Sequence, residues 1–375
     1  MRKRLAAIIL SFALILGLAA PAAAIEIGAQ SAILIDAATG RVLYQKNAHQ
    51  VSSVASLTKV MTALVALEES QSLSQPLTLP DDFVNVGESG IYLQPGETHS
   101  LEDMLYALLL GSANDAAQAI AIGVAGSEAA FVQLMNERTA LLGLTDSVWA
   151  NPHGLDQLNH QSTAYDMAMI CREAMFIPEF NVMIATDTWN IPWPGNEFDR
   201  EIYNHNRFLS QYEGADGIKT GYTDQAGNCL AASVTRDGMR LIGVVLNSED
   251  HYGEMTAMMD YGFERFRQVE IMPAGEVVGE IRVINGKISS IRPVLSRDAS
   301  IVIPVTAEYT PEPVIELEQS ISTPFTATTV VGSVTYTDNI GTETVLPVYA
   351  GSDQQVYTFW LVFREAWQKL VHILL

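Results

Sequence analysis

The sequence predicts an α/β (α+β) fold, in which helices flank an antiparallel sheet, followed by a small all-β domain and a C-terminal amphipathic helix. Three observations predict it. The chain has 375 residues, 48% of them hydrophobic and 17% charged, which is enough apolar material and length for two domains. Strand-like runs lie near both ends of residues 25–268, with helical patterns between them. After residue 268, β-branched runs alternate with Gly, Pro and Asn turns.

The first 24 residues have the pattern of a signal peptide. Three basic residues, Arg2, Lys3 and Arg4, precede an apolar run, and Pro21 is followed by three alanines at the expected cleavage positions. An uncleaved N-terminal anchor is the alternative. We expect an exported protein whose mature chain begins near Ile25.

Residues 25–268 are expected to form the larger domain. A hairpin is predicted from Ala32 to Tyr44 and a second from Cys229 to Asn247, around the turn Arg236-Asp237-Gly238. Helical patterns lie between them, and Ser100 and Thr163 are placed as N-caps. The predicted helices cover residues 57–67, 101–111, 128–142 and 163–175. A sheet with strands from both chain ends is therefore expected.

Residues 269–352 are expected to form an independent all-β domain, with a hairpin over residues 281–288 that turns at Asn285-Gly286. In residues 355–375, polar side chains share one helical face between Glu365 and His372, while two Trp and two Phe lie elsewhere. This pattern favours a helix lying in a membrane interface over one that spans it. A helix packed on the β domain is the alternative.

Composition excludes several classes of function. The formal net charge is −22, from 21 Lys+Arg against 43 Asp+Glu, so nucleic acid is not an expected partner. Only two cysteines are present, which excludes a disulfide framework and a zinc site of four thiolates. Cys171 lies in a helical apolar pattern and Cys229 in a strand-like run, so two buried free thiols are expected.

Three short motifs carry the candidate chemistry. In Ser56-Leu57-Thr58-Lys59, Ser and Lys share a helical face, so a neutral Lys59 can remove the Ser56 proton. Lys219-Thr220-Gly221 precedes the second hairpin and offers a cation, a hydroxyl and close backbone approach to a carboxylate. Ser112-Ala113-Asn114 follows Gly111 at a helix break, which can aim a hydroxyl and an amide into a cleft.

Together these motifs resemble those of the serine D-alanyl-D-alanine carboxypeptidases, the low-molecular-mass penicillin-binding proteins. The resemblance covers the chain from signal peptide to C-terminal helix. Its segments are Ala55–Thr62, Ser112–Ala116, Asn151–Leu155 and Asp216–Thr223.

The resemblance implies a β-lactamase/transpeptidase-like domain, a β stalk and an amphipathic anchor on the outer face of the cytoplasmic membrane. It implies that Ser56 is acylated with Lys59 as base, and that Ser112 and Asn114 relay a proton and hold the substrate amide. Lys219, Thr220 and Gly221 would receive the terminal carboxylate, and the backbone N–H groups of Ser56 and Tyr222 would form the oxyanion hole. Either His205 or Arg207 would supply a further basic group.

The implied reaction removes the terminal D-alanine of peptidoglycan stem pentapeptides without a cofactor, in cell-wall maturation, and β-lactams would acylate the same serine. Two alternatives are a β-lactamase and a penicillin-binding sensor or wall-binding module. His153, Asp156 and His160 could suggest zinc, but their segment is predicted as a loop without fixed ligand geometry, so no metal is expected. Asp81, Asp82 and Glu88 are interpreted as a solvated acidic surface.

Overall fold

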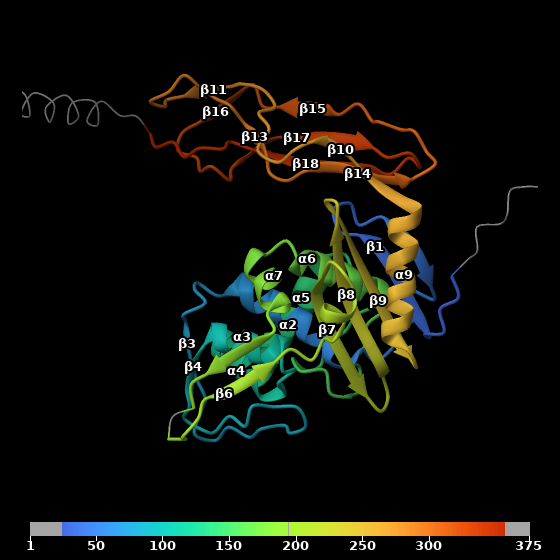
Figure 1. Ribbon diagram of the computed structural model, residues 1–375. Coiled ribbons are helices and arrows are strands. Elements are labelled where there is room, and N and C mark those ends of the chain that lie inside the picture. The colour runs from blue at the N-terminus through green and yellow to red at the C-terminus, as the bar shows by residue number, and fades with distance from the viewer. Residues whose placement is uncertain (1–24, 194, 357–375) are drawn as a thin grey trace, which may run out of the picture. The chain divides into compact units, whose positions relative to one another are not determined.

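The structure is a computed structural model that describes residues 25–193 and 195–356 (Figure 1). The predicted signal peptide and almost all of the predicted C-terminal helix lie outside the described residues. The described chain forms two compact units, the first made mostly of residues before Phe263 and the second beginning there. The turn segments Ile35–Val42 and Thr235–Leu241 are grouped with the second unit.

A five-stranded sheet organises the first unit, in the order β2-β1-β9-β8-β7. Its strands come from both chain ends, which confirms the predicted arrangement. They are β1 (Ser31–Asp36), β2 (Val42–Lys46), β7 (Ala215–Thr223), β8 (Gly227–Arg236) and β9 (Met239–Ser248). Lys219-Thr220-Gly221 precedes the hairpin of β8 and β9, as predicted, and is itself part of a strand, β7, which pairs with β8 along its whole length. As β7 is the edge strand, its outer edge has no strand partner and contacts η1 (Ala55–Leu57), which carries Ser56.

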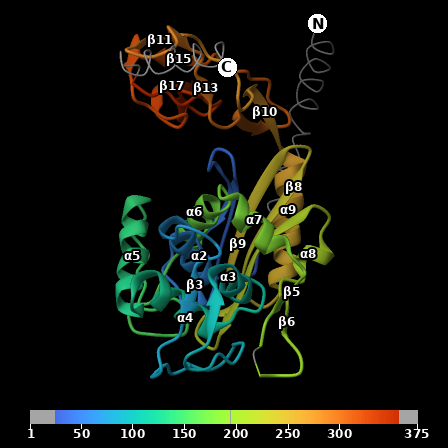
Figure 2. The same ribbon diagram turned by 90° about the vertical axis from the view of Figure 1, so that its left-hand side faces the viewer.

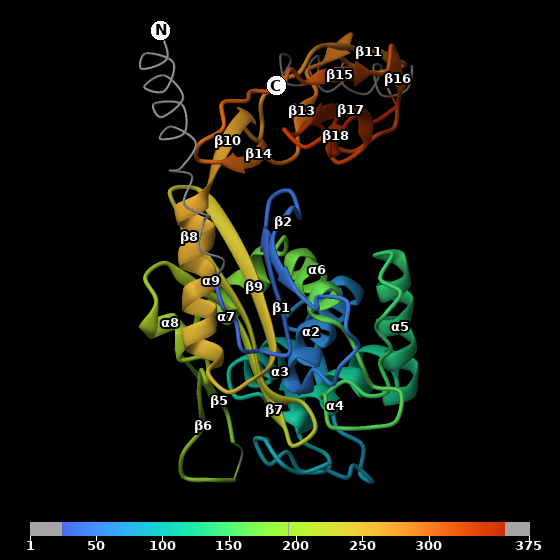
Figure 3. The same ribbon diagram turned by 90° about the vertical axis from the view of Figure 1, so that its right-hand side faces the viewer.

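Helices cover both faces of this sheet (Figures 1 and 3). On one face lie α2 (Thr58–Glu69), α3 (Leu101–Leu109), α4 (Asn114–Ala125), α5 (Glu128–Leu141) and α6 (Ala164–Ala174). On the other lies α9 (His251–Arg265), whose Met255 packs on β9: a Cβ built on Gly243 would be 2.4 Å from its sulfur. Shorter elements complete the unit. They are η1 (Ala55–Leu57), α7 (Pro178–Ala185), α8 (Phe208–Gln211), β3 (Pro76–Thr78), β4 (Thr98–Ser100), β5 (Thr188–Ile191) and β6 (Arg200–Tyr203).

The local signals for helix starts are confirmed. The Ser100 side chain accepts a hydrogen bond from the Asp103 backbone N–H, and Thr163 does the same for Asp166. Helix α2 contacts α3, α4, α5 and α6, among which it lies in Figure 2. It is buried from Thr58 to Ala66, so Lys59 is placed in the core of the unit.

The second unit is built of strands. Two strands pair as β10 (Phe266–Met272) and β14 (Ala299–Pro304), and the expected domain boundary after residue 268 falls inside β10. A three-stranded sheet has the order β12-β11-β16 and a four-stranded sheet the order β13-β18-β17-β15. Their bounds are β11 (Ile281–Ile284), β12 (Ser290–Ile291), β13 (Val294–Leu295), β15 (Val314–Leu317), β16 (Ser320–Ser322), β17 (Val330–Thr337) and β18 (Glu343–Tyr349).

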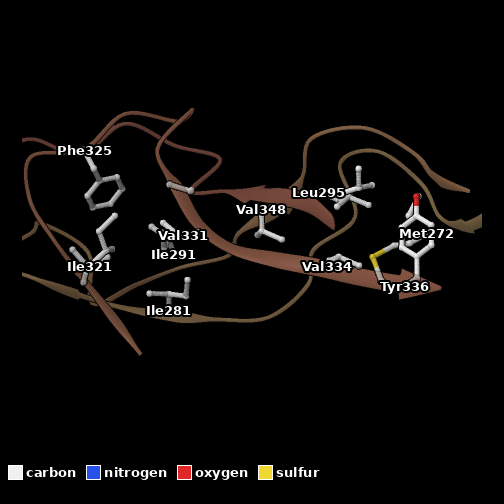
Figure 4. Close-up of a cluster of buried hydrophobic side chains, with 14 of the residues drawn as sticks. Met272, Ile281, Ile291, Leu295, Ile321, Phe325, Val331, Val334, Tyr336 and Val348 are labelled. Carbon is white, nitrogen blue, oxygen red and sulfur yellow. The ribbon is translucent and has the colours of Figure 1, made fainter. Parts of the chain in front are cut away.

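Apolar side chains from these sheets form one core in the second unit, in which Val331, Val334 and Val348 are fully buried (Figure 4). The predicted hairpin over residues 281–288 is only partly right. Strand β11 pairs with Ser290–Ile291, so the connection is longer than two residues. Its Asn285 has the positive φ expected of a turn, but the Val283 N–H donates to the Ser289 carbonyl and not to a residue next to Gly286.

Within the described ranges, no single helix is long and apolar enough to cross a membrane. One pair, α4 and α5, meets the length and composition criteria together but is bent by 85°.

The fold class predicted from the sequence is confirmed in both units. Cys171 and Cys229 are buried and unpaired, as expected.

Candidate active site

Ser56 and Lys59 meet at the start of the central helix. Ser56 lies in η1, which leads directly into α2, and the Lys59 Nζ is 3.0 Å from the Ser56 Oγ. The same Nζ donates to the Asn114 Oδ1 at 2.7 Å and to the His153 carbonyl at 2.6 Å. The Asn114 and His153 oxygens can only accept, so each takes one N–H group of Lys59. The third neighbour, a hydroxyl, is the one that can donate a proton.

The surroundings of Lys59 favour its neutral form. Its side chain is fully buried, and burial, followed by the positive charge of Lys219, holds its pKa well below the usual value. The negative charges of Asp115 and Glu88 oppose this shift. A neutral Lys59 that donates two hydrogen bonds to carbonyl oxygens keeps its lone pair for the Ser56 hydroxyl, which is the arrangement of a general base beside a nucleophile.

Ser112 and Asn114 lie at the break between α3 and α4. Ser112 has φ +57°, a left-handed conformation that ends one helix and turns the chain into the next. The Asn114 amide is held at both ends: its oxygen accepts from Lys59, and its nitrogen donates to the Gly87 carbonyl at 3.0 Å. Ser112 lines the cavity beside Ser56, whereas Asn114 is buried beneath it.

Strand β7 forms the opposite wall of the site. A Cβ built on Gly221 would lie 3.1 Å from the Ser56 backbone nitrogen, a tight contact, so glycine favours this close approach of the strand. Lys219 is almost fully buried, and burial lowers its pKa to about 7. Its Nζ donates to the Thr220 carbonyl at 3.1 Å. Lys219 therefore lies beneath the wall, while Thr220, Gly221 and Tyr222 line the cavity.

The cavity above Ser56 has a volume of about 390 Å³. Both basic residues left open by the sequence, His205 and Arg207, line it. Burial, followed by the charge of Lys219, lowers the pKa of His205. Five further lining residues were not assigned to the site from the sequence: Glu88, Ser89, Asn228, His251 and Tyr252. The interpretation of Glu88 as part of a solvated surface is incomplete, because this exposed residue also borders the cavity.

A buried carboxylate holds the loop that carries Glu88 and Ser89. Asp115 is fully buried and accepts hydrogen bonds from the backbone N–H groups of Ile91 and Leu93 and from the Asn85 side chain. A Cβ on Gly90 would lie 2.9 Å from its Oδ2, so the loop is packed tightly around this acid. Asp115 occurs in a motif quoted for the resemblance, but its own role could not be inferred from sequence because its partners lie in a separate loop of the chain.

The segment from Asn151 to Leu155 contacts the helix start that carries Ser56 and Lys59. Its Asn151 side chain accepts from the Gly154 N–H at 2.7 Å, which shapes the turn, and its His153 carbonyl accepts from Lys59. The His153 Nδ1 accepts from the Leu155 N–H, and burial lowers the pKa of His153 to about 3. His160 accepts from the Ala150 N–H and has a pKa of about 4, also because of burial. These imidazoles are neutral parts of the scaffold.

No group of three or more His, Cys, Asp or Glu side chains with the arrangement of a metal site is found in the described part of the chain. Every residue that the sequence nominated for the site is nevertheless brought together. Ser56, Lys59, Ser112 and Asn114 come from the helical side, and Lys219 to Tyr222 from the sheet edge. The site combines a nucleophile, Ser56, a neutral amine, Lys59, and the basic side chain of Lys219 beneath strand β7. This combination suits acyl transfer from a substrate that carries a nearby carboxylate.

Comparison with known proteins agrees with this chemistry. A family model described as D-alanyl-D-alanine carboxypeptidase matches residues 18–250. A second model, described as the C-terminal domain of penicillin-binding protein 5, matches residues 266–355.

Individual relatives match both sequence and structure. The chain is 34% identical over 283 residues to the D-alanyl-D-alanine carboxypeptidase DacF of Bacillus subtilis, covering 73% of this chain and 72% of that protein. It is 33% identical over 281 residues to DacD of Escherichia coli, covering 70% of each. Penicillin-binding protein 5 from Haemophilus influenzae superimposes with a TM-score of 0.67 at 28% identity, over 88% of this chain and 99% of that one.

Proposed function

Because this chain belongs to the D-alanyl-D-alanine carboxypeptidase family, we propose that Ser56 is its acylated nucleophile and Lys59 the base that activates it. The chain is a serine hydrolase of peptidoglycan metabolism with a penicillin-binding-protein fold. The observation that supports the assignment of roles is the 3.0 Å approach of the Lys59 Nζ to the Ser56 Oγ, in a position where its other two partners are carbonyl oxygens.

In the acylation step, the Ser56 Oγ attacks the carbonyl carbon of the penultimate D-alanine while its proton moves to the Lys59 Nζ. The carbonyl oxygen, now negative, accepts from the backbone N–H groups of Ser56 and Tyr222, whose strand is held against η1 by Gly221. The C–N bond then breaks, and the leaving D-alanine takes a proton, relayed by Ser112. Water hydrolyses the ester in the second half of the reaction.

The terminal carboxylate of the substrate is assigned to the wall of the cavity that strand β7 forms. Thr220 and Gly221 line this wall and would contact the carboxylate, and Lys219 lies directly beneath them, where its positive charge acts at short range in a desolvated setting. Asn114 orients Lys59 and has a second amide proton available for the substrate carbonyl. A free carboxylate at this position would make the enzyme an exopeptidase.

The deciding experiment combines two measurements. The enzyme is incubated with a stem pentapeptide and the released D-alanine is measured, and a β-lactam adduct is located by peptide mass spectrometry. We expect D-alanine release and one adduct, on the peptide that contains Ser56, both lost in Ser56→Ala. An adduct that persists in Ser56→Ala contradicts the assignment of the nucleophile. Rapid β-lactam hydrolysis without D-alanine release would instead favour the β-lactamase alternative.

We further propose that residues 1–24 direct export, that residues 269–352 act as a stalk, and that residues 355–375 attach the enzyme to the outer face of the cytoplasmic membrane. The aromatic side chains and polar face in the sequence of the last segment support the attachment. Because a chain with a net charge of −22 is repelled by anionic lipid, attachment would depend on apolar burial and resist high salt. Truncation before Tyr357 should release the enzyme into the soluble fraction with peptide hydrolysis intact; a truncated enzyme that still sediments with membranes contradicts the proposal.

A further inference from the structure

A second cavity lies in the first unit, next to the nucleophile along the chain. It has a volume of about 540 Å³, within the range of small-molecule sites. It is lined by two segments and by Gln225, which follows β7. The segments are Val51–Ser53, which leads to Ser56, and Asp156–Gln161, which follows the turn beneath Lys59. The cavity shares no lining residue with the one above Ser56.

The lining is rich in neutral hydrogen-bonding groups. Hydroxyls and amides are supplied by Ser52, Ser53, Gln157, Asn159, Gln161 and Gln225. Across the described ranges, no hydrogen bond engages the side chains of Ser53, Gln161 or Gln225. These side chains are half-buried or exposed, so their polar groups are open to a ligand in the cavity.

The charge of the lining narrows the ligand class. Asp156 contributes a carboxylate, and one of its oxygens already accepts from the Thr223 hydroxyl at 3.0 Å. No Lys or Arg is among the lining residues, and His160 has a pKa of about 4, so it is neutral at physiological pH. Such a lining repels a carboxylate. It matches a ligand with hydroxyl and acetamide groups, and the exposed Leu158 offers an apolar surface to the face of a sugar ring.

The position of the cavity matches the geometry of a peptidoglycan substrate. Ser53 is three residues from Ser56, so their Cα atoms are at most about 11 Å apart. A stem peptide is joined at its amino end to an N-acetylated sugar, and four extended residues separate that sugar from the carbonyl attacked by Ser56. Four residues span at most about 14 Å. The sugar end of a bound substrate can therefore reach this cavity.

We propose that the cavity between Val51–Ser53 and Asp156–Gln161 binds the glycan end of the substrate, through neutral hydrogen bonds to its hydroxyl and acetamide groups. This inference rests on the proposed function. It makes the enzyme prefer stem peptides that are still attached to glycan over free peptides, although the reacting groups are identical.

The test compares D-alanine release from a free pentapeptide and from the same pentapeptide carrying its disaccharide. For the wild-type enzyme we expect a higher kcat/KM on the disaccharide substrate. The double variant Ser53→Ala/Gln225→Ala removes two neutral hydrogen-bonding groups from the cavity. We expect it to lower the ratio of the two kcat/KM values about tenfold, mainly through KM of the disaccharide substrate.

A matched control is Ser70→Ala/Gln71→Ala, which makes the same chemical change at a different cavity. It should leave the ratio unchanged. Equal wild-type kcat/KM values on the two substrates, or an equal loss on both in the cavity variant, overturn the inference while leaving the carboxypeptidase function intact. Release of D-alanine from neither substrate overturns the proposed function, and the inference with it.

A ligand group other than the glycan in this cavity would change the activities on the two substrates in a different way. If the cavity instead binds an amine on a side chain of the stem peptide through Asp156, Asp156→Asn lowers activity on both substrates, and acetylation of that amine has the same effect in the wild-type enzyme. That result would overturn the glycan assignment.

Discussion

Gly154 lies directly against the carbonyl group of Ala55, the residue before the nucleophile. A Cβ built on Gly154 would be 2.1 Å from the Ala55 oxygen, and its φ of +90° is itself in the region that favours glycine. The Lys59 Nζ donates to the carbonyl of the neighbouring His153, so the turn cannot move away from the helix without losing that bond. The position of Ser56 therefore depends on a residue almost a hundred positions later in the chain.

We expect Gly154→Ala to lose about 3 kcal/mol or more of unfolding free energy and most of its β-lactam acylation rate, because the added methyl group must displace η1. Thermal or urea unfolding and the rate of adduct formation measure the two effects. The control is Gly126→Ala at the C-terminus of α4, which has a similar φ of +80° but no atom near its Cβ position. It should cost about 1 kcal/mol and leave acylation unchanged. Equal effects of the two substitutions would mean that the contact with Ala55 is unimportant.

The protonation of Lys219 predicts a pH dependence of substrate binding. Because burial lowers its pKa to about 7, Lys219 is charged below this pH and loses its charge as the pH rises through it. We expect KM for a pentapeptide to rise from about pH 7 upward as the attraction for the terminal carboxylate is lost. The C-terminal amide of the same peptide serves as control, since it has no carboxylate, and its KM should not follow this profile. A KM for the free acid that is constant from about pH 6 to about pH 9 contradicts the role given to Lys219.

Asp115→Asn should weaken the loop that borders the cavity and lower the pKa of Lys59. An amide nitrogen cannot accept from the Ile91 and Leu93 N–H groups, so the loop bearing Glu88 and Ser89 loses part of its support. Removal of the negative charge should also lower the pKa of Lys59 further, because Asp115 raises it in the native enzyme. We expect a kcat/KM reduced about tenfold or more, with the acidic limb of its pH profile moved to lower pH.

Asn85→Ala separates these two effects, since it removes one hydrogen bond from a neutral donor to Asp115 and leaves the charge in place. It should weaken the loop without moving the acidic limb. If both variants give the same pH profile, the Asp115 charge does not act on Lys59.

Glu97 and Arg200 form a buried ion pair. It joins the end of the loop that carries Glu88 and Ser89 to strand β6. The Arg200 Nη2 donates to both Glu97 oxygens at 2.9 Å, and the arginine is only 5% exposed. Burial alone would raise the pKa of Glu97, but hydrogen bonds from Arg200 and His99 outweigh it and lower the pKa. The stabilisation is therefore present above the unfolded-state pKa of Glu97 and is lost as the pH falls through its folded-state pKa.

Glu97→Gln should destabilise the fold by about 3 kcal/mol at neutral pH, because it leaves a buried guanidinium without its counter-charge. The control is Glu68→Gln, which breaks the more exposed pair with Arg138 and should cost less than about 1 kcal/mol. Urea unfolding at neutral pH and near pH 4 distinguishes the two, since the difference between the variants should shrink at the lower pH. A difference that is independent of pH contradicts the electrostatic account.

Several features of this protein follow from the sequence alone, because they depend on residues close together in the chain. The caps Ser100 and Thr163 set helix starts through bonds to residues three positions later. The turns after Ala37 and Arg236 separate strands that pair as hairpins, and the spacing of Ser56 and Lys59 brings their side chains together on one helical face. The sequence also predicted that the three motifs serve one reaction. Members of a family share their reacting groups, so the resemblance identifies them without a structure.

Only the tertiary structure decided the rest. The burial that lowers the pKa of Lys59 and Lys219 arises where α2 packs among the surrounding helices and η1 packs against β7. The tie between Asp115 and the backbone of Ile91, the contact of Gly154 with Ala55 and the placement of His251 and Tyr252 on the cavity join residues from distant parts of the chain. Local pattern carries no information about such contacts, because they form only when the sheet brings the two ends of the first unit together and the helices pack against it.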